Sequence, residues 1–295
     1  MANSSWFDGD LYNKMSEDLQ ITGKGKRTHD GYLREIRKLA DHYQCTPDRL
    51  HEAQIRRYFL HLKNVKHYAE GSLTVTLSAL KFFFRTTCPR DWETLGQLKV
   101  KAPKTLPEVI TIEQVHSIID ACTTQRMAVF FWTVYSLGLR LNEAIHLQVG
   151  DIDAQRGLVH VHRGKGAKDR YVPLPTSTLD ALREHWKTHR HERFLFPADG
   201  RKHRGMSSAK MPMAETTPQD AMKRITEKLG FKKKVSTHTL RHSYATHLYE
   251  AGVSLKSIQK FLGHSSLQTT LMYVHLTETA EADARQVVEK LFRRK

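Results

Sequence analysis

The chain has few of the residues that stabilise a secreted protein. Only three cysteines occur among its 295 residues, namely Cys45, Cys88 and Cys122. Their spacing forms neither a disulfide framework nor a Cys-x-x-Cys metal motif. The first residues lack a basic start followed by an apolar run, so we expect no signal peptide. These features predict a reducing compartment, the cytoplasm.

Long hydrophobic runs are missing as well. The longest one extends from Met127 to Leu139 and is interrupted by Thr133 and Ser136. A membrane-spanning helix needs about 20 apolar residues, so this segment predicts a buried core helix and no membrane partner.

Two familiar binding motifs are incomplete. The glycine-rich stretch RGKGAKDR does not match the G-x-x-x-x-G-K-[ST] pattern, which argues against a bound nucleotide. His238 and His242 have the spacing of a zinc-protease pair, but Thr239 stands where such a protease has Glu. Because the chain has 18 histidines, chance pairs are expected. We therefore predict no metal and no cofactor.

Basic residues are abundant instead. The chain has 47 Lys and Arg against 31 Asp and Glu, a formal net charge of +16. Such an excess indicates an extended polyanionic partner, and double-stranded DNA is the obvious one. Charge alone would also fit an RNA-binding protein or a protein at a membrane surface.

The first third of the chain predicts a helical domain. Residues 1–27 are expected to form an irregular tail that ends in a basic cluster. Three segments of helical periodicity follow within residues 28–98, and the stretch KVKAPKTLP, residues 99–107, predicts a linker. The three helices are expected to begin at Thr28, at Thr46 with Pro47, and near Ser72.

Residues 108–295 predict a second, mainly α-helical domain with a small β-hairpin. Thr111 and Gln114 have the spacing of a capping box, so the domain should begin with a helix. Leu158 to His162 and Tyr171 to Leu174 alternate apolar and polar residues, with Lys165 near the turn between them. Residues 199–216 are expected to form a long loop. The overall fold class is therefore α+β, with helices dominant.

The last helices carry four residues suited to phosphodiester chemistry. His238 and Arg241 are three apart and share a helix face; His264 follows a helix-ending glycine, and Tyr273 is expected on a short helix capped by Ser265 and Ser266. A guanidinium can hold phosphate oxygens, imidazoles can move protons, and a phenol can attack phosphorus. Two helices joined by a glycine turn also fit a helix-turn-helix, so a non-catalytic DNA-binding protein is the rival interpretation.

A fifth candidate precedes the hairpin. Arg140 comes directly after the apolar helix, so its position should be rigid, as a phosphate clamp requires. Glu143 is three residues later and is expected to orient Arg140. An exposed helical ion pair of little energetic value is the alternative.

Four motifs resemble those of the tyrosine recombinases, which include phage-type integrases and the Xer resolvases. They are HTLRHSYATHL, IQKFLGHSSLQTTLMYVH, LGLRLNEAIHLQVGDID and GKGAKDRYVPL. The resemblance implies a SAM-like core-binding domain at 28–98 ahead of a catalytic domain at 108–295, the two forming a C-shaped clamp around DNA. It also implies a tetramer on two DNA sites, in which the helix at 277–295 packs on a neighbouring protomer.

The resemblance further assigns catalytic roles. Tyr273 would be the nucleophile, Arg140 and Arg241 would bind the phosphoryl oxygens, and His264 would add a donor. His238 is the candidate base and Lys165, on the hairpin, the candidate acid. The product would be a 3′-phosphotyrosine and a free 5′-hydroxyl, formed without metal, nucleotide or cofactor.

These observations predict a site-specific DNA recombinase that acts in integration, excision or resolution, in bacterial cytoplasm at the nucleoid. A type IB topoisomerase would share the chemistry and remains a second alternative. The motifs do not separate a phage integrase, an Xer-type resolvase and a recombinase of a mobile element.

Overall fold

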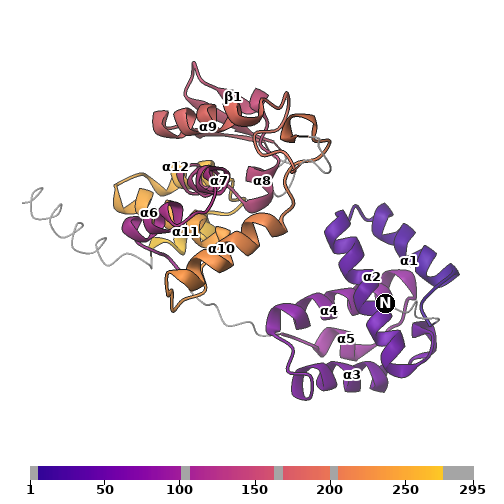
Figure 1. Cartoon of the computed structure of the whole chain (residues 1–295). Helices are drawn as coiled ribbons and strands as arrows, with labels where there is room; N and C mark the ends of the chain where they lie inside the picture. Colours follow the sequence, from indigo (N-terminus) through magenta and orange to yellow (C-terminus); the bar gives the residue numbers. More distant parts are fainter. Residues whose placement is uncertain (1–5, 101–106, 163–168, 200–204, 275–295) are drawn as a thin grey trace, which may run out of the picture. The chain divides into compact units, whose positions relative to one another are not determined.

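The computed structural model describes residues 6–100, 107–162, 169–199 and 205–274. The chain divides into two compact units, residues 1–104 and 105–295 (Figure 1). Each unit has its own hydrophobic core, and the two are described separately. No helix in these ranges is both long and apolar enough to cross a membrane.

The first unit is a bundle of helices. In it α2 packs on α4, α1 packs on α2, and α3 contacts α4. Its elements are α1 (Asp10–Ile21), α2 (Lys26–Tyr43), the 3-10 turn η1 (Pro47–Arg49), α3 (Glu52–Asn64), α4 (Glu70–Phe82), the π-helical turn η2 (Phe83–Thr87) and α5 (Glu93–Gln97).

Two expectations for this unit were wrong. Residues 10–21 form helix α1 rather than an irregular tail, because Met15 and Leu19, one turn apart, are fully buried in the core of the bundle. That i, i+4 spacing was the missed signal. The helix expected at Thr46 begins instead at Glu52, since Pro47–Arg49 form a separate 3-10 turn.

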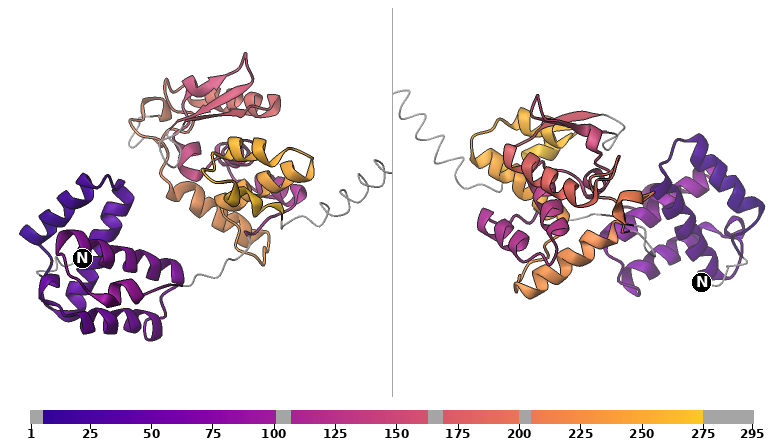
Figure 2. Two further views of the ribbon diagram at one scale, coloured as in Figure 1. Left: turned by 180° about the vertical axis from the view of Figure 1, so that it is seen from behind. Right: turned by 45° about the horizontal axis from the view of Figure 1, so that its top comes forward.

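The second unit combines helices with one small sheet. Its helices are α6 (Ile112–Asp120), α7 (Gln125–Ser136), α8 (Leu141–Ile145), α9 (Thr176–His189), α10 (Thr216–Lys228), α11 (Thr237–Glu250), α12 (Leu255–Leu262) and α13 (Leu267–Leu271), with 3-10 turns η3 (Val149–Asp151) and η4 (Met206–Ser208). The apolar helix α7 packs against both α9 and α11 (Figure 2).

The sheet is antiparallel, in the order β1 (Ile152–Asp153), β2 (Leu158–Val161) and β3 (Arg170–Pro173). Val161 pairs with Arg170, and Leu158 pairs with Pro173. The predicted hairpin strands are thus present, whereas residues 163–168 of its turn lie outside the described residues. So do 101–106 of the predicted linker and the predicted terminal helix at 277–295.

Local capping signals place the helices that matter for the site. Thr111 and Gln114 form the predicted capping box at the start of α6. Ser236, Ser254 and Ser266 accept hydrogen bonds from backbone amides at the starts of α11, α12 and α13. These hydroxyls satisfy amides that have no partner inside the helix.

Two details of the second unit differ from expectation. Tyr273 does not lie on the last helix, because α13 ends at Leu271. Part of the expected loop at 199–216 is ordered: the amide of Met213 donates to the carbonyl of Phe196 over 2.8 Å, and the Met213 side chain is buried. Residues 200–204 lie outside the described ranges.

Candidate active site

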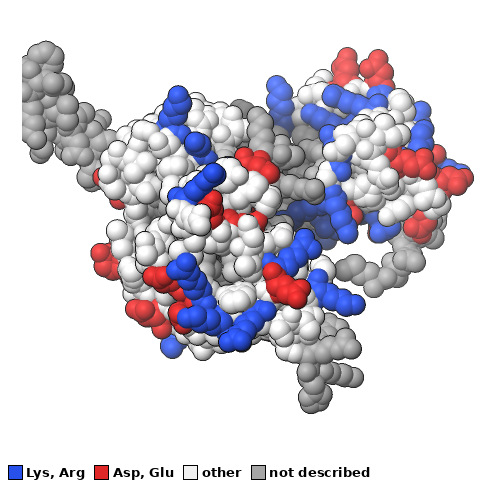
Figure 3. All heavy atoms as spheres, turned by 90° about the horizontal axis from the view of Figure 1, so that it is seen from above, with Lys and Arg blue, Asp and Glu red and all other residues white. Residues whose placement is uncertain are grey.

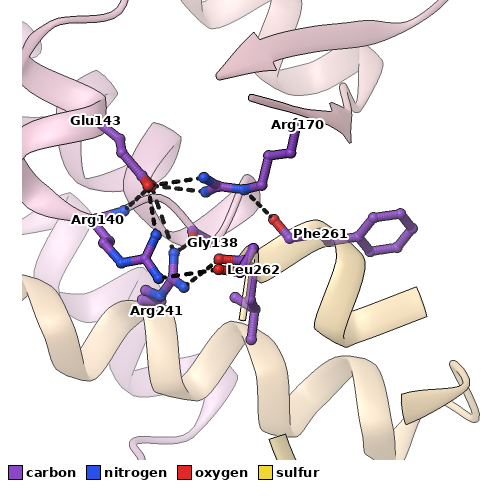
Figure 4. A network of polar contacts seen from close by, with 8 residues as sticks. Gly138, Arg140, Glu143, Arg170, Arg241, Phe261 and Leu262 are labelled. Atoms are coloured by element: carbon purple, nitrogen blue, oxygen red, sulfur yellow. Dashed lines mark hydrogen bonds and ion pairs between the residues drawn. The ribbon is translucent and has the colours of Figure 1, made fainter. Parts of the chain in front are cut away.

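Glu143 lies at the centre of a cluster of three arginines (Figure 4). Its carboxylate accepts hydrogen bonds from Arg140 and Arg170 and is 3.7 Å from Nη1 of Arg241. These residues come from three separate parts of the second unit: the start of α8, strand β3 and helix α11. The cluster therefore forms only when the unit folds.

Both carboxylate oxygens of Glu143 accept hydrogen bonds from Arg140. Its backbone amide donates to Oε2 of Glu143 over 2.8 Å, and its Nη1 donates to Oε1 over 2.7 Å. Nη2 is 3.5 Å from the carbonyl of Gly263. The contact between Arg140 and Glu143 is thus not an exposed ion pair, since the Glu143 side chain is only 7% exposed and that of Arg140 is 23% exposed.

Arg241 is almost completely buried. Its Nη1 donates to the carbonyl of Gly138 over 2.7 Å, and its Nη2 donates to the carbonyl of Leu262 over 2.6 Å. Burial, followed by the nearby charge of Arg140, lowers the pKa of Arg241 to about 9. The side chain therefore keeps its charge at neutral pH and is fixed between the turn that follows α7 and the end of α12.

Arg170 is the member of the cluster that the sequence analysis missed. It makes a bidentate pair with Glu143, with both bonds at 2.8 Å, and its Nε donates to the carbonyl of Phe261 over 2.7 Å. Alternation along β3 was the available signal, because Arg170 and Val172 both face inward. An inward arginine requires a buried partner, and Glu143 is that partner.

Gly263 makes room for Arg170. A Cβ added to Gly263 would lie 2.9 Å from Cδ of Arg170, and the glycine has a φ of 63°. A larger residue here would press on Arg170 and would be strained in the left-handed backbone region, so it could be accommodated only if neighbouring atoms shifted. The glycine that ends α12 thus also lets the arginine cluster close.

The cluster carries an excess of positive charge. Burial alone would raise the pKa of Glu143, but the hydrogen bonds and charge of Arg170, with contributions from Arg140 and Arg241, lower that pKa to about 2. In the described part of the chain, the ion pairs of all three arginines go to this one carboxylate. One negative charge against three positive charges suits the binding of an anion such as a phosphodiester.

Tyr273, the nucleophile that the resemblance implies, lies in the interior, although an attacking phenol has to reach a phosphate. The residue is 0% exposed, and its hydroxyl is 3.0 Å from Nδ1 of His242. Its ring stacks on that of His264, with the planes 14° apart. Burial raises the pKa of Tyr273 to about 12, although Arg241 and Arg140 oppose that rise. The phenol is therefore protonated and covered in this conformation.

Two histidines, His242 and His264, lie against this tyrosine, and a third, His238, lies against His242; all three are neutral at pH 7. Burial is the main cause in each case, with Arg241 and Arg140 adding to it at His238 and His264. The pKa of His238 is lowered, that of His242 falls to about 4 and that of His264 to about 3. Among the described residues, the phenol contacts His242 rather than His238, the base expected from sequence.

His242 was therefore missed. It follows His238 by one turn of α11, and the two rings lie 4.7 Å apart. The spacing was visible in the sequence, but only the fold shows that this face of α11 meets Tyr273. Lys165, the expected acid, lies outside the described residues.

Among the described residues, one group of side chains has metal-ligand chemistry. Ligand atoms of Asp151, His160 and His162 lie within 4.8 Å of one another. Both oxygens of Asp151 are already engaged: Oδ1 is 2.6 Å from Nε2 of His162, and Oδ2 accepts from the amide of Gln148 over 2.8 Å. These bonds account for Asp151 and His162 as a link between η3 and the residue that follows β2.

One pocket adjoins the arginine cluster, and another lies beside His238. The first, of about 730 Å³, is lined by Arg140, Glu143, His162 and Arg193, among others. The second, of about 940 Å³, reaches His238 and is lined on one side by residues 232–234, all lysine. Figure 3 shows one face of the molecule, on which each unit carries Lys and Arg side chains with Asp and Glu among them. Basic side chains around a buried cationic centre suit a long polyanion.

Two family models match the chain. The Phage integrase family model matches residues 108–280, and the model "Phage integrase, N-terminal SAM-like domain" matches residues 11–94. Each match falls within one of the two units.

Curated relatives are similar over most of the chain. The putative integrase/recombinase y4qK of Sinorhizobium fredii is 36% identical over 267 residues, which are 90% of this chain and 84% of that protein. Tyrosine recombinase XerA of Thermococcus kodakarensis is 32% identical over 278 residues, 92% of this chain and 94% of that protein.

Solved structures share the fold. A XerH recombinase bound to palindromic difH substrate in a post-cleavage complex superposes with a TM-score of 0.70 at 18% identity, covering 98% of this chain and 92% of that chain. A lambda integrase dimer bound to a COC′ core site gives 0.69 at 16% identity, covering 89% and 75%. The predicted fold class, helical with a small sheet, is confirmed.

Proposed function

The chain belongs to the phage integrase family of tyrosine recombinases, and on this premise we propose how its own residues cut and rejoin DNA at a specific site. The observation that carries the proposal is the cluster of three arginines around Glu143, with Tyr273 packed within electrostatic range of Arg140 and Arg241. This combination supports covalent attack on a DNA phosphate.

The arginines bind the phosphate that is attacked. A guanidinium has five N–H donors. Arg241 donates to two backbone carbonyl oxygens, and Glu143 accepts only some of the hydrogen bonds that Arg140 and Arg170 can donate. Remaining donors are available for phosphoryl oxygens, which gain charge in the transition state. Fixed donors of this kind need no reorganisation during the reaction, and this is the source of the rate acceleration.

Tyr273 is the nucleophile. Its oxygen forms a bond to phosphorus, its proton passes to a neutral imidazole, and the bond from phosphorus to the 5′ oxygen of the next nucleotide breaks. His238 is the proposed acceptor of that proton and Lys165 the proposed donor to the leaving oxygen. His264 adds a hydrogen-bond donor. The 3′-phosphotyrosine retains the energy of a phosphodiester, so a 5′-hydroxyl from a second duplex reverses the step.

The phenol has to move before it attacks. A side chain that is 0% exposed cannot contact a phosphodiester, so the described conformation precedes productive DNA binding. Movement of the segment after α12 would bring Tyr273 toward Arg140 and Arg241.

The assembly that we propose follows from the reaction. Exchange between two duplexes needs two sites with two protomers each, hence a tetramer on two double-stranded DNA sites. Helix α1 and residues 28–98 form its SAM-like DNA-binding domain, 99–107 the linker and 108–295 the catalytic domain, and both domains bind DNA. The substrate is chromosomal or mobile-element DNA, so we place the protein at the nucleoid in the cytoplasm. The reaction needs no metal, nucleotide or other cofactor.

A Tyr273→Phe variant tests the proposal. A DNA site is first selected by its binding to the protein and then prepared as a nicked suicide substrate. Wild-type protein should become covalently linked to this DNA, whereas Tyr273→Phe should bind it equally well and form no adduct. Binding without any adduct by the wild type would instead favour a non-catalytic DNA-binding protein.

An assay on supercoiled plasmid distinguishes a recombinase from a type IB topoisomerase, which is the second alternative. A recombinase acts only on plasmid that carries its selected site, whereas a type IB topoisomerase would relax plasmids with and without that site equally.

A further inference from the structure

We propose that His242 is a positioning residue that holds Tyr273 in its covered position, so that loss of this bond is part of activating DNA cleavage. The inference rests on the function proposed above. It concerns a histidine that is separate from the expected catalytic set.

The contact joins two segments that are far apart in the chain. His242 lies on α11, and Tyr273 lies beyond the end of α13, with Nδ1 and the hydroxyl oxygen 3.0 Å apart. The ring centroids are 5.8 Å apart and the planes are tilted by 51°. The bond therefore fastens the segment that carries the nucleophile to a helix in the core of the second unit.

The two protonation states allow either direction of this hydrogen bond, and the burial of the phenol decides between them. Burial, followed by His238 and Arg241, lowers the pKa of His242 to about 4, so its ring is neutral at pH 7. The pKa of Tyr273 is raised to about 12, so the phenol keeps its proton. Among the described residues, the bond to His242 is the one hydrogen bond of the Tyr273 hydroxyl, so a phenol that did not donate to it would leave a buried donor unpaired. We therefore assign the hydroxyl as the donor to Nδ1, with the ring proton on Nε2. In this arrangement the phenol's only proton is committed to His242.

The segment that carries Tyr273 is held by the packing of the Tyr273 side chain with Tyr244, Ile258 and Leu262, by a hydrogen bond of 3.0 Å between Thr270 and His264, and by the bond to His242. Helix α13 has only five residues, and of these only Thr270 is buried. Leu267, at its start, is 45% exposed. Elements with little buried apolar surface open more readily than the core. The hydrogen bond to α11 is therefore one of a small number of contacts that keep the phenol covered, and its loss should shift the balance toward the uncovered state.

The same helix provides a matched control. His247, further along α11, shares a hydrogen bond of 2.8 Å through its Nδ1 with the hydroxyl of Tyr135. Tyr135 lies on α7 and is no part of the proposed catalytic set. Removal of this second bond tests the general effect of losing a histidine–tyrosine contact in the unit.

The experiment compares His242→Leu, His242→Asn and His247→Leu in the full chain. Leucine removes the acceptor, whereas the side-chain amide of asparagine offers an oxygen near the position of Nδ1. Two quantities are measured: the single-turnover rate of covalent adduct formation on the nicked site at saturating protein, and the phenol titration of Tyr273. The titration is obtained as the absorbance difference between each protein and its Tyr273→Phe counterpart.

We expect His242→Leu to form adduct roughly three- to tenfold faster, since a neutral hydrogen bond contributes about that factor to an equilibrium. The titration of Tyr273 should move down from about 12 toward the ordinary value for tyrosine. His242→Asn and His247→Leu should match the wild type in both measurements.

Two results would overturn the inference. Equal slowing by His242→Leu and His242→Asn would make His242 the proton acceptor, because an amide can accept a hydrogen bond but not a proton. Unchanged titration and unchanged adduct rate in His242→Leu would show that the bond does not hold the phenol. If wild-type protein forms no adduct, the proposed function fails, whereas the titration still tests the hold on Tyr273.

Discussion

Each of the two units buries one glutamate among basic residues, and the two sites differ in where the positive charge lies. In the first unit, Glu35 accepts from the hydroxyl of Thr76 and from Lys38, both over 2.8 Å. Lys38 is 42% exposed and is therefore solvated. In the second unit, the arginines that surround Glu143 are largely buried, with the Arg170 side chain 6% exposed.

This difference separates a structural from a functional role. An exposed lysine interacts with water and salt, so Glu35 with Thr76 simply joins α2 to α4. Buried guanidiniums cannot be neutralised by solvent, and one carboxylate does not balance three of them. The site at Glu143 is thus prepared for a second anion, and the site at Glu35 is not.

The largest expected effect comes from removing the negative charge of Glu143 at the centre of the arginine cluster. Glu143→Gln leaves three guanidiniums without a carboxylate, and we expect the unfolding free energy of the second unit to fall by about 3–5 kcal/mol. Glu35→Gln should cost the first unit only about 1–2 kcal/mol, because Thr76 can still donate to the amide oxygen. Denaturant unfolding of both variants measures the two losses, and equal losses would erase the distinction between the sites.

Changing a cation without changing its charge is the next test. Arg241→Lys loses the forked geometry that spans the carbonyls of Gly138 and Leu262 and that would face a phosphate. Adduct formation should slow by about 100- to 1,000-fold, as for loss of one transition-state donor. Lys38→Arg in the first unit is the control and should leave adduct formation as it is. A normal rate for Arg241→Lys would show that charge alone suffices.

Acid should weaken the second unit through Glu143. The folded pKa of about 2 lies below the ordinary value of 4.5, so the carboxylate contributes stability at neutral pH. That contribution is complete above about pH 5 and is lost as the pH falls toward 2, for a total of about 3 kcal/mol. Unfolding curves between these pH values should show this loss in the wild type and a smaller one in Glu143→Gln. Identical slopes would contradict the prediction.

A smaller effect is expected at Gly263. Alanine there would be strained at a φ of 63° and would press on Cδ of Arg170, at a cost of about 1–2 kcal/mol to the second unit. Gly252 is the control, because its φ is also positive but nothing lies within 4 Å of an added Cβ. If Gly252→Ala costs as much as Gly263→Ala, backbone strain explains the whole effect and Arg170 explains none of it.

Some of these features could be predicted because they are local. The contact between Arg140 and Glu143 spans three residues, the capping box of Thr111 spans three, and the strands of the hairpin alternate. Helix α1 was equally local, and its i, i+4 pattern at Met15 and Leu19 was overlooked. Short-range patterns of this kind are set by the geometry of one element.

The missed site residues depend on long-range contacts. Arg170 meets Glu143 across 27 positions and His242 meets Tyr273 across 31. No periodicity reports such pairs, because they arise only when β3, α8 and α11 pack together. The covering of Tyr273 was missed for the same reason.

The order of chemically suitable residues in the chain was sufficient to suggest a tyrosine recombinase, since each motif lies within one or two adjacent elements. Only the packed unit decided which side chains meet: three arginines share one carboxylate, and the phenol donates to His242 inside the protein. Burial is a property of the assembled core, and it is burial that concentrates the positive charge and protects the nucleophile.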